Sequence, residues 1–434
     1  MRIAVIGVGH VGLVTAAAMA QLGHVVVGLD EDASKIATLA SGETPFFEPG
    51  LLDLVRKGQA VGRLSFTGDI AEAMAGARVA FICVGTPARP DGEANLQAVD
   101  RAAQAAATHA TQELVIVQKS TVPVKTAQRL KALCNNVTTY GLHLASNPEF
   151  LREGQAVVDF LRPDRILVGA DEPYPHSVMR EVYGPMIGRG VPYFATDIGT
   201  AELAKHACNA FLAIKISYAN ALARLCESTG ADVVSIADIM GADKRIGRAF
   251  LDAGIGYGGY CLPKDLSAFK VTARSLGYDF GLLDQAMKIN REALEATLAK
   301  IKNAVWNLEG KRILLLGLAF KAGTDDIRES PALYLARMLM DEGAEVVGYD
   351  PKANEAARGQ VDGLKVEDDV YRGAEGAHCL VVCTEWPEFR QLDLERLKGI
   401  VTLPIIVDGR NLLDQEMVAQ AGFSYLPTGR PPAA

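Results

Sequence analysis

Cys261 is the side chain whose setting most strongly suggests chemistry, because it closes a glycine-rich stretch. Residues 254–265 read GIGYGGYCLPKD, with four glycines within six positions. Such a density of glycine indicates a backbone packed closely against another group. A thiol beside Lys264 and Asp265 can act as a thiolate nucleophile. The alternative interpretation is an inert cysteine buried in a tight loop.

Lys205 and Asn209 form a second candidate pair, four positions apart in a proline-free segment that predicts a helix. Residues with this spacing project from the same helix face. Both lie outside the apolar stripe of the segment, so we expect that neither has to be buried. A lysine and an amide side by side can donate hydrogen bonds to a developing oxyanion. A solvated polar face of the helix is the alternative.

A glycine motif near the N-terminus predicts a dinucleotide site. Gly7, Gly9 and Gly12 form GxGxxG between an apolar strand and a helix, and Asp30 ends the next strand. The glycines permit a tight turn, close approach of a pyrophosphate and close helix–strand packing. Asp30 can accept hydrogen bonds from a ribose and would repel a 2′-phosphate, which favours NAD over NADP. The alternative is a glycine turn in a flavodoxin-like sheet.

Residues 146–154, SNPEFLREG, follow the first α/β block and supply two carboxylates, Glu149 and Glu153. Carboxylates in such a position are candidates for base chemistry. A polar loop without a chemical role is the alternative.

A second α/β region begins with residues 317–321, GLAFK, and lacks GxGxxG. We therefore expect it to bind something other than a dinucleotide. Lys321 comes just after a strand, where the crevice of such sheets lies, and could meet a phosphate. A solvated surface lysine is the alternative.

The elements that position these residues alternate in type along the chain. Short apolar runs predict strands at 2–7, 24–30, 79–85 and 113–119, and again at 311–317, 345–350, 378–383 and 404–408. Helical patterns separate them, which is typical of doubly wound parallel sheets. We therefore expect an α/β fold with two Rossmann-like doubly wound domains, joined by a long central helix and a helical middle region.

The long helix is predicted from about 199 to 228. Its apolar stripe consists of Leu203, Ala207, Ala210, Ile214, Tyr218, Ala221 and Leu225. A helix of this length should connect two lobes, and its exposed part could pack against a second subunit. The expected domains are 1–198, 199–300 and 301–434. We expect the tail PTGRPPAA to be frayed.

Composition excludes some classes of function. The 434 residues carry a formal net charge of −8, which argues against a nucleic-acid surface and an anionic-membrane binder. No apolar run reaches the roughly 18 residues needed to span a bilayer, and no signal peptide precedes the glycine motif. The seven cysteines include no CxxC pair, so we expect reduced, mostly buried thiols, a cytoplasmic location and no metal site.

Together these segments resemble the UDP-glucose 6-dehydrogenase family of nucleotide-sugar dehydrogenases. The matching motifs cover almost the whole chain in the family's order. They are GVGHVG, KSTVPV (119–124), SNPEFLREG (146–154), PDRILVG (163–169), KHACNAF (205–211), CESTGAD (226–232), KRIG (244–247), GYGGYCLPKD (256–265), GLAFKAGTDDIRESP (317–331), CTEWPEF (383–389) and DGRNLL (408–413).

The resemblance implies roles for individual residues. Cys261 matches the catalytic thiol, Lys205 and Asn209 the pair near the reacting oxygen, Asp265 an aspartate for water and proton steps, and Thr121 and Glu149 residues that place water or act as base. The implied cofactor contacts are Gly7, Gly9, Val11, Gly12, Asp30, Lys35, Thr86, Ser120, Thr121, Glu153, Lys264 and Arg328. The implied substrate contacts are Glu149, Phe150, Leu151, Lys205, Asn209, Arg245, Phe250, Leu251, Tyr257, Gly258, Lys321 and Arg410. Arg245 is similar to an arginine that reaches across a dimer.

The implied activity is the NAD-dependent four-electron oxidation of UDP-glucose to UDP-glucuronate by a homodimer or higher homo-oligomer, a step towards polysaccharides. A GDP-mannose or UDP-N-acetylhexosamine dehydrogenase is the nearest rival, and residues 163–165 and 256–265 favour the UDP-glucose branch. A two-electron hydroxyacid dehydrogenase would have no use for Cys261. A non-catalytic NAD sensor would not need the set of candidate catalytic residues. Tyr260 departs from the family, where many members have serine.

Overall fold

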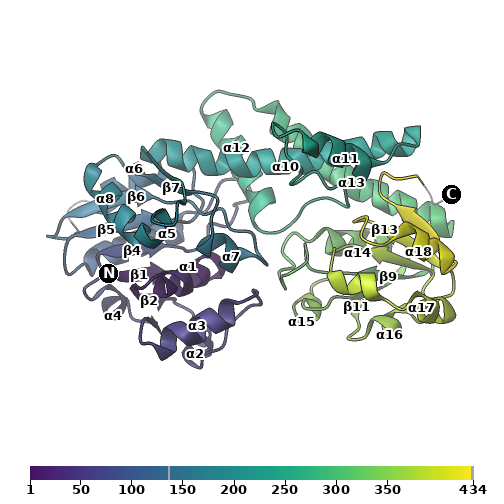
Figure 1. The fold of residues 1–434 in the computed structure, drawn as a ribbon, viewed down its shortest axis with the longest axis horizontal. Coiled ribbons are helices and arrows are strands. Elements are labelled where there is room, and N and C mark those ends of the chain that lie inside the picture. The colour runs from purple at the N-terminus through teal and green to yellow at the C-terminus, as the bar shows by residue number, and fades with distance from the viewer. Residues whose placement is uncertain (135–136, 432–434) are drawn as a thin grey trace. The chain divides into compact units, whose positions relative to one another are not determined.

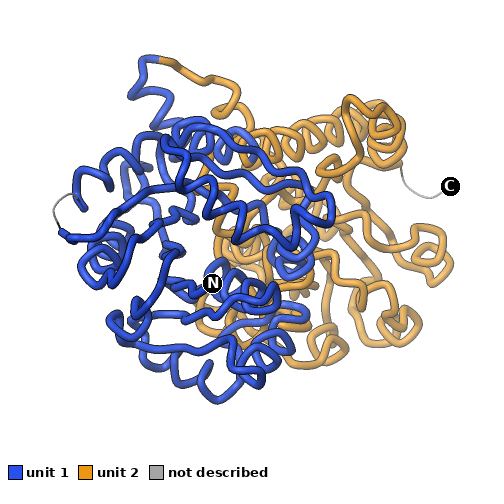
Figure 2. The backbone as a smooth tube through the Cα atoms, turned by 60° about the vertical axis from the view of Figure 1, so that its left-hand side comes forward, with its two compact units in different colours: residues 1–208, 267–277 blue, residues 209–266, 278–434 orange. Residues whose placement is uncertain are grey.

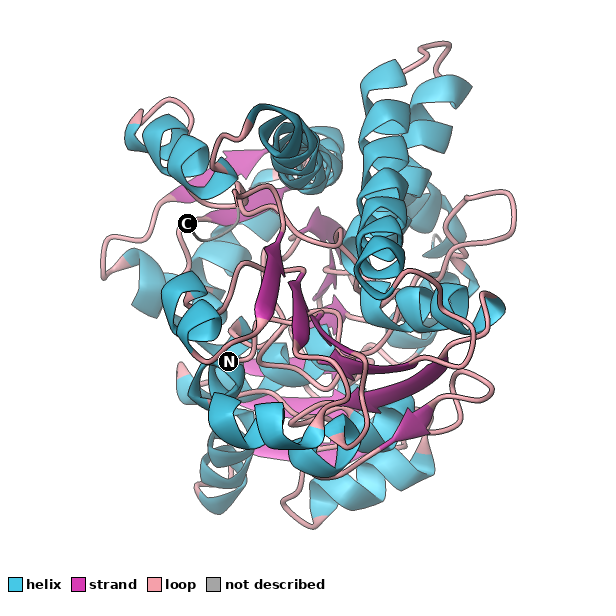
Figure 3. Cartoon of the chain, turned by 90° about the vertical axis from the view of Figure 1, so that its right-hand side faces the viewer, coloured by secondary structure: helices cyan, strands magenta, loops and turns pink. Residues whose placement is uncertain are grey.

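The computed structural model describes residues 1–134 and 137–431, and it divides into two compact units. Unit 1 comprises residues 1–208 and 267–277, and unit 2 comprises residues 209–266 and 278–434 (Figure 2). Each unit is built on one sheet, and Figure 3 shows the strands of both sheets among helices.

Unit 1 holds an eight-stranded sheet in the order β3-β2-β1-β4-β5-β6-β7-β8 (Figure 1). All neighbours are parallel except β6 and β7. The strands are β1 (Arg2–Ile6), β2 (Val25–Leu29), β3 (Leu64–Thr67), β4 (Val79–Ile82), β5 (Leu114–Gln118), β6 (Leu142–Ser146), β7 (Ile166–Gly169) and β8 (Tyr193–Thr196). The helices are α1 (His10–Gln21), α2 (Ala33–Ala40), α3 (Leu51–Ala60), α4 (Ile70–Met74), α5 (Gln97–Thr108), α6 (Thr126–Cys134), α7 (Ala156–Leu161), α8 (Pro173–Val182) and α9 (Gly184–Ile187).

The central strands of unit 1 are buried and almost entirely apolar because helices cover both faces of the sheet. Every residue of β4 and β5 is buried, as expected for parallel strands. Two separate apolar clusters contain alternate residues of β1, such as Ile3 and Val5 in one and Ala4 and Ile6 in the other. The period-two alternation thus places one core on each side of the sheet.

Unit 2 holds a six-stranded, fully parallel sheet in the order β11-β10-β9-β12-β13-β14. The strands are β9 (Arg312–Leu316), β10 (Glu345–Tyr349), β11 (Lys365–Val366), β12 (Cys379–Val382), β13 (Ile405–Asp408) and β14 (Ser424–Pro427). The helices are α11 (Val233–Ala242), α13 (Gly281–Val305), α14 (Pro331–Asp341), α15 (Asn354–Ala357), α16 (Val370–Ala374), α17 (Leu394–Ile400) and α18 (Gln415–Gln420), with the 3-10 helix η1 (Pro387–Gln391). Two apolar clusters again cover the two faces.

Two helices, α10 (Ile198–Thr229) and α12 (Cys261–Ser275), have residues in both units. The predicted fold class is therefore confirmed: two doubly wound sheets, a helix of 32 residues and a helical middle region. The predicted strands agree with the observed ones to within one to three residues at each end.

Several residues of the apolar stripe of α10 are exposed. Phe211 and Leu225 are 61% and 62% exposed, and Leu203 and Tyr218 of the apolar stripe are also exposed. The buried side of the helix is instead partly polar and includes Glu202, Lys205, His206 and Asn209. Buried polar groups need hydrogen-bond partners, and these partners determine which side of α10 faces inward.

The expectation of a frayed tail is also wrong for residues 427–430, while the last three residues lie outside the described part. Gly429 N donates to Glu227 Oε1 at 3.0 Å, and Arg430 pairs with Asp232 at 3.2 Å. Lys300 Nζ donates to Pro427 O at 2.5 Å. The segment after β14 is thus held against the helical part of unit 2.

Within residues 1–134 and 137–431, no helix is long and apolar enough to cross a membrane. The seven cysteines are all thiols, and five of them are buried.

Candidate functional site

The glycine motif of unit 1 forms the turn between β1 and α1. Gly7 has a φ of +89°, and a Cβ there would lie 2.9 Å from Val84 N. At Gly12 a Cβ would lie 1.7 Å from the carbonyl oxygen of Gly7. These two positions therefore admit no side chain, for reasons internal to the fold.

Gly9 is glycine for a different reason. It is the N-cap of α1 and makes no side-chain cap, and no atom of the described residues lies within 4 Å of a Cβ built there. The first turn of α1 contains no acidic residue and includes the half-buried Val11. Backbone N–H groups at an open helix N-terminus suit the pyrophosphate of a dinucleotide, so the turn fits NAD.

Asp30 lies just beyond β2, beside this turn. Its Oδ2 accepts hydrogen bonds from Val8 N at 2.9 Å and from Lys35 Nζ at 2.8 Å. Lys35 belongs to α2, whose N-cap Asp32 donates from its backbone N to Asp30 Oδ1 at 3.1 Å. Asp30 is thus held at the place where a ribose would lie in this fold.

Three further predicted cofactor residues meet where β4 and β5 end. Thr86 Oγ1 donates to Thr121 O at 3.0 Å, and Ser120 Oγ donates to Val84 O at 2.6 Å. The two strands are parallel neighbours, so their carboxyl ends bring these segments to one edge of the sheet.

Glu149 and Lys205 form a buried ion pair at 3.0 Å. Glu149 Oε2 also accepts from Leu151 N at 2.5 Å. The ring of Phe150 lies beneath two cations, Arg165 at 3.8 Å and Lys205 at 5.4 Å from its centroid. Glu149, Phe150 and Leu151 line a cavity of about 220 Å³ within unit 1.

The loop that carries Glu149 is anchored by residues that the sequence reasoning missed. Asn147 Oδ1 accepts from Lys119 Nζ at 3.1 Å and from Tyr183 Oη at 2.5 Å, and Asn147 Nδ2 donates to Leu167 O at 2.7 Å. Burial lowers the pKa of Lys119 to about 8. A lysine directly after a fully buried strand was the available signal for a buried cation.

The far end of the same loop is anchored by Glu48, another missed residue. Its carboxylate accepts from Gly154 N at 2.7 Å and Ala156 N at 2.8 Å. These two bonds fix the backbone directly after the half-buried Glu153. No sequence signal connects Glu48 to residues more than a hundred positions away.

In unit 2, Cys261 is the first residue of α12. Amide N–H groups at a helix N-terminus favour negative charge, which suits a thiolate. Lys264 and Asp265 are the fourth and fifth residues of the helix, and Lys264 Nζ donates to Asp265 Oδ1 at 2.5 Å. Burial raises the pKa of other thiols, to about 12 for Cys83 and Cys379, so these remain protonated at neutral pH.

Asn209 joins this cluster from α10. Its Nδ2 donates to Asp265 Oδ2 at 2.6 Å. Lys205 and Asn209 are only 4% and 6% exposed, which corrects the expectation that neither has to be buried. The physical reason is that each is paired with a buried carboxylate, Glu149 for one and Asp265 for the other.

The glycines before Cys261 do pack closely, as predicted. A Cβ at Gly258 would lie 2.1 Å from Glu329 O, and one at Gly259 would lie 2.7 Å from the ring of Phe320. Asn290 brackets Tyr257 by accepting from its N at 2.8 Å and donating to its O at 3.0 Å. Asn290 is a further residue that sequence reasoning missed.

Most predicted substrate contacts of unit 2 surround this loop. Lys321 lies over the ring of Phe320, which contacts Gly259. Arg410 donates from Nε to Cys383 O at 2.7 Å and lies beside Gly254. Tyr257 and Leu251 are buried, and Phe250 has a φ of +65°.

Arg245 is not brought to this group. Its side chain is 89% exposed and forms an ion pair with Asp243 at 2.6 Å. Within the described part of the chain, no group of three or more histidine, cysteine or acidic residues is placed to hold a metal ion.

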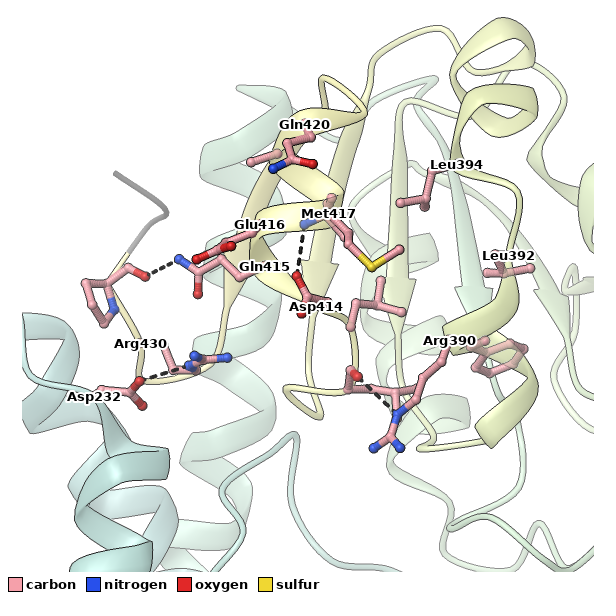
Figure 4. Close-up of a pocket in the computed structure, with 16 residues that line it drawn as sticks. Asp232, Arg390, Leu392, Leu394, Asp414, Gln415, Glu416, Met417, Gln420 and Arg430 are labelled. Atoms are coloured by element: carbon pink, nitrogen blue, oxygen red, sulfur yellow. Dashed lines mark hydrogen bonds and ion pairs between the residues drawn. The ribbon is translucent and has the colours of Figure 1, made fainter.

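A cavity of about 1030 Å³ in unit 2 lies elsewhere (Figure 4). Arg430, paired with Asp232, borders it on one side, and Leu392, Leu394 and Met417 form much of its apolar wall. None of the predicted site residues lines it. Cavity size alone would therefore have pointed away from the residues with chemical potential.

Comparison with known proteins agrees with the geometry of both units. Three family models match in succession, described as the NAD binding domain (residues 1–187), central domain (199–292) and UDP binding domain (314–415) of the UDP-glucose/GDP-mannose dehydrogenase family.

Curated relatives cover the chain from end to end. A protein named UDP-glucose 6-dehydrogenase from Rhizobium meliloti is 44% identical over 99% of this chain and 100% of its own length. One named UDP-glucose 6-dehydrogenase TuaD from Bacillus subtilis is 41% identical over 99% of this chain and 93% of its own length.

A solved UDP-glucose dehydrogenase from Pyrobaculum islandicum matches with a TM-score of 0.91 and 36% identity, covering 99% of this chain and 98% of that one. The matched domains, the dinucleotide turn and the full-length relatives point to one conclusion. The chain belongs to the UDP-glucose/GDP-mannose dehydrogenase family and is an NAD-dependent oxidoreductase.

Proposed function

We propose that the protein oxidises UDP-glucose to UDP-glucuronate in two steps, with two NADH formed per substrate and Cys261 as the covalent nucleophile. Full-length relatives named UDP-glucose 6-dehydrogenase support the substrate. The observation that carries the chemistry is the position of Cys261 at the start of α12, followed at once by the Lys264–Asp265 pair to which Asn209 is bonded.

The first oxidation requires a base for the C6 hydroxyl proton. Glu149, directly or through water placed by Thr121, takes this proton, and its pairing with Lys205 orients the carboxylate. The Gly7–Gly12 turn would hold NAD, which when bound supplies the hydride acceptor, one molecule for each of the two oxidations. The Cys261 thiolate then attacks the aldehyde carbon and forms a thiohemiacetal.

Lys205 and Asn209 stabilise the oxyanion of this adduct. An ammonium has three N–H donors and a primary amide has two, so each group can bond its carboxylate and an oxyanion at once. The second oxidation leaves a thioester on Cys261. Asp265 or Glu149 activates the water that hydrolyses it and releases the carboxylate product and the thiol.

The binding roles are proposed residue by residue. The cofactor contacts are Gly7, Gly9, Val11, Gly12, Asp30, Lys35, Thr86, Ser120, Thr121, Glu153, Lys264 and Arg328. The substrate contacts are Glu149, Phe150, Leu151, Lys205, Asn209, Arg245, Phe250, Leu251, Tyr257, Gly258, Lys321 and Arg410. The UDP binding domain description of residues 314–415 supports assigning the nucleotide to unit 2. We keep the division into domains 1–198, 199–300 and 301–434 as part of the proposal.

We further propose a homodimer in which the exposed apolar stripe of α10 is covered. Phe211, Tyr218 and Leu225 are large exposed apolar residues on one helix, which is typical of an interaction face. Arg245, exposed in the single chain, would then serve the partner's substrate. Phe211→Glu should convert the dimer to a monomer in light scattering, whereas Val61→Glu, at an equally exposed apolar residue, should not.

The reduced thiols support a cytoplasmic location.

The decisive experiment counts NADH formed per molecule of sugar across a panel of UDP-glucose, UDP-N-acetylhexosamines and GDP-mannose. Two NADH per UDP-glucose, with the highest kcat/KM for that sugar, is expected. Preference for GDP-mannose or a UDP-N-acetylhexosamine would replace the substrate. One NADH per substrate would indicate a two-electron dehydrogenase and overturn the covalent mechanism.

Cysteine variants test the nucleophile directly. Cys261→Ala should lower carboxylate formation about 10³-fold or more, and Cys261→Ser should accumulate a slowly hydrolysed ester that intact-mass measurement detects. Cys208 is the other thiol that is not buried, so Cys208→Ala is the matched control and should retain turnover. Full four-electron turnover by Cys261→Ala would exclude covalent catalysis at this position.

A further inference from the structure

We propose that Tyr260 is a positioning residue whose ring holds Lys264 and Arg328 in place for NAD, beside the nucleophile Cys261. The ring centroid lies 4.4 Å from Arg328 Cζ and 5.5 Å from Lys264 Nζ. The proposal deepens the proposed function and rests on it, because both cations are cofactor contacts in that scheme.

The orientation of Arg328 is determined from two directions. Asp326 accepts from Nε at 2.9 Å and from Nη2 at 2.5 Å, so the carboxylate occupies one edge of the guanidinium. The Tyr260 ring occupies a face, at a distance typical of cation–π contacts. An edge and a face together determine the guanidinium plane, and a planar donor must be oriented before it can bind an anion well.

Lys264 is restrained in the same manner. Its Nζ bonds Asp265 Oδ1 at 2.5 Å, and Asp265 Oδ2 in turn accepts from Asn209 at 2.6 Å. The ring of Tyr260 therefore stands between two ion pairs, Arg328–Asp326 and Lys264–Asp265. Loss of the ring would remove one restraint from each cation while leaving both ion pairs in place.

The backbone places Tyr260 firmly enough for this role. Gly259 N donates to Arg328 O at 3.1 Å, and neither Gly258 nor Gly259 has room for a side chain. The residue before the ring is thus bonded to the backbone of the arginine that the ring contacts. Ring and guanidinium cannot shift independently by much.

Unit 1 contains the same arrangement independently. Phe150 follows Glu149 and lies under Arg165 and Lys205, and Lys205 pairs with Glu149. In each unit an aromatic residue adjacent to a reacting residue contacts one arginine and one lysine. A ring attracts cations without neutralising them, so the positive charge remains available to an anionic ligand.

A double-mutant cycle on NAD binding tests the proposal, with Kd measured calorimetrically on the full-length protein without sugar. Tyr260→Leu should weaken NAD binding about five- to tenfold, because the ring contact to both cations is lost. Tyr260→Phe keeps the ring and should bind NAD like the parent protein. In an Arg328→Met background, the effect of Tyr260→Leu should fall to about twofold or less, since most of it acts through Arg328.

Equal effects of Tyr260→Leu with and without Arg328 would overturn the proposal, because a merely structural role is additive. Unchanged NAD affinity in Tyr260→Leu would also overturn it. If Tyr260→Leu has a lower unfolding midpoint than the parent protein, Tyr260→Ser provides a second variant that lacks the ring. Binding is measured without turnover, so failure here is distinguishable from failure of the two-NADH stoichiometry.

Discussion

The two parallel sheets of this protein begin alike and then diverge. In unit 1, the tight glycine Gly7 follows β1 directly, and α1 starts three residues later at His10. In unit 2, Gly317 follows β9 directly, also with a positive φ of +99°, but α14 starts only at Pro331. The same opening turn is followed by an exposed helix N-terminus in one unit and by a long segment in the other.

The carboxylates that follow the second strand of each unit, Asp30 and Asp350, also differ in their surroundings. Asp30 holds Val8 N and Lys35 and remains partly exposed. Asp350, after β10, is buried and accepts from five donors, the backbone N of Leu318, Ala319, Lys352 and Ala353 and the indole N of Trp386. Asp30 remains available to a ligand, whereas Asp350 is occupied by hydrogen bonds within its own unit.

The largest expected effect is on stability at Asp350. Asp350→Ala leaves five donors, four of them in buried hydrogen bonds, without their acceptor and should destabilise unit 2 by about 3–5 kcal/mol. Both tryptophans, Trp306 and Trp386, lie in unit 2, so tryptophan fluorescence during urea unfolding reports on it specifically. Asp30→Ala is the matched control and should leave that transition unchanged. Equal shifts of the urea unfolding transition in Asp350→Ala and Asp30→Ala would contradict the proposed difference between the two carboxylates.

A second expected effect, on NAD affinity, separates the glycines of the turn. Gly9→Ala places a methyl group where no described atom lies within 4 Å, so the protein should fold while binding NAD about a hundredfold more weakly. Gly399→Ala, in α17 and equally uncrowded, should not alter NAD binding. Normal NAD affinity in Gly9→Ala would show that the pyrophosphate lies elsewhere.

A smaller effect concerns the choice of cofactor. Asp30→Asn keeps an acceptor but removes the charge that repels a 2′-phosphate, so the preference for NAD over NADP should fall about tenfold. Steady-state KM values for both cofactors measure this ratio. The corresponding Asp350→Asn should not change it, and any change there would indicate a second dinucleotide site.

The smallest effect is a pH dependence with opposite signs in the two units. Burial lowers the pKa of Lys119, after β5, to about 8, well below the ordinary value of a lysine, so above pH 8 the unfolded chain binds more protons than the folded one. The free energy of unfolding of unit 1 should therefore rise by about 1 kcal/mol between pH 8 and 9.

Hydrogen exchange of unit 1 peptides measures this rise, and Lys119→Met should abolish it. Burial instead raises the pKa of Asp408, at the end of β13 in unit 2. Its contribution to stability is therefore lost as pH rises above about 4. A rise above pH 8 that persists in Lys119→Met would assign the effect to another group.

The sequence predicted the elements well because their signals are local. Apolar runs, glycine turns and a proline-free stretch identified β1, α1 and α10 within a few residues. Asp30 and Asp350, by contrast, each close an apolar strand and look alike in the sequence. Their difference depends on Trp386 and other donors distant along the chain, which no local pattern contains.

The site was predictable as a set of residues but not as a network. Cys261, Lys205 and Asn209 were identified from type, spacing and resemblance. Their partners were not, because the ion pair of Lys205 with Glu149 joins positions 56 apart. The apolar spacing of α10 also did not indicate that Lys205 and Asn209 are buried, since hydrophobicity alone cannot separate a face that packs inside the chain from one left exposed.

The discontinuous make-up of the units has a consequence for synthesis. Unit 1 includes residues 267–277, where Phe269 stacks on His206, so it is incomplete until the ribosome has passed residue 277. Unit 2 ends with β14 and with Gly429 bonded to Glu227, so it is incomplete until residue 429 has emerged. Domains generally fold as units during synthesis. Unit 1 is therefore still incomplete when the first residues of unit 2 have already left the ribosomal exit tunnel.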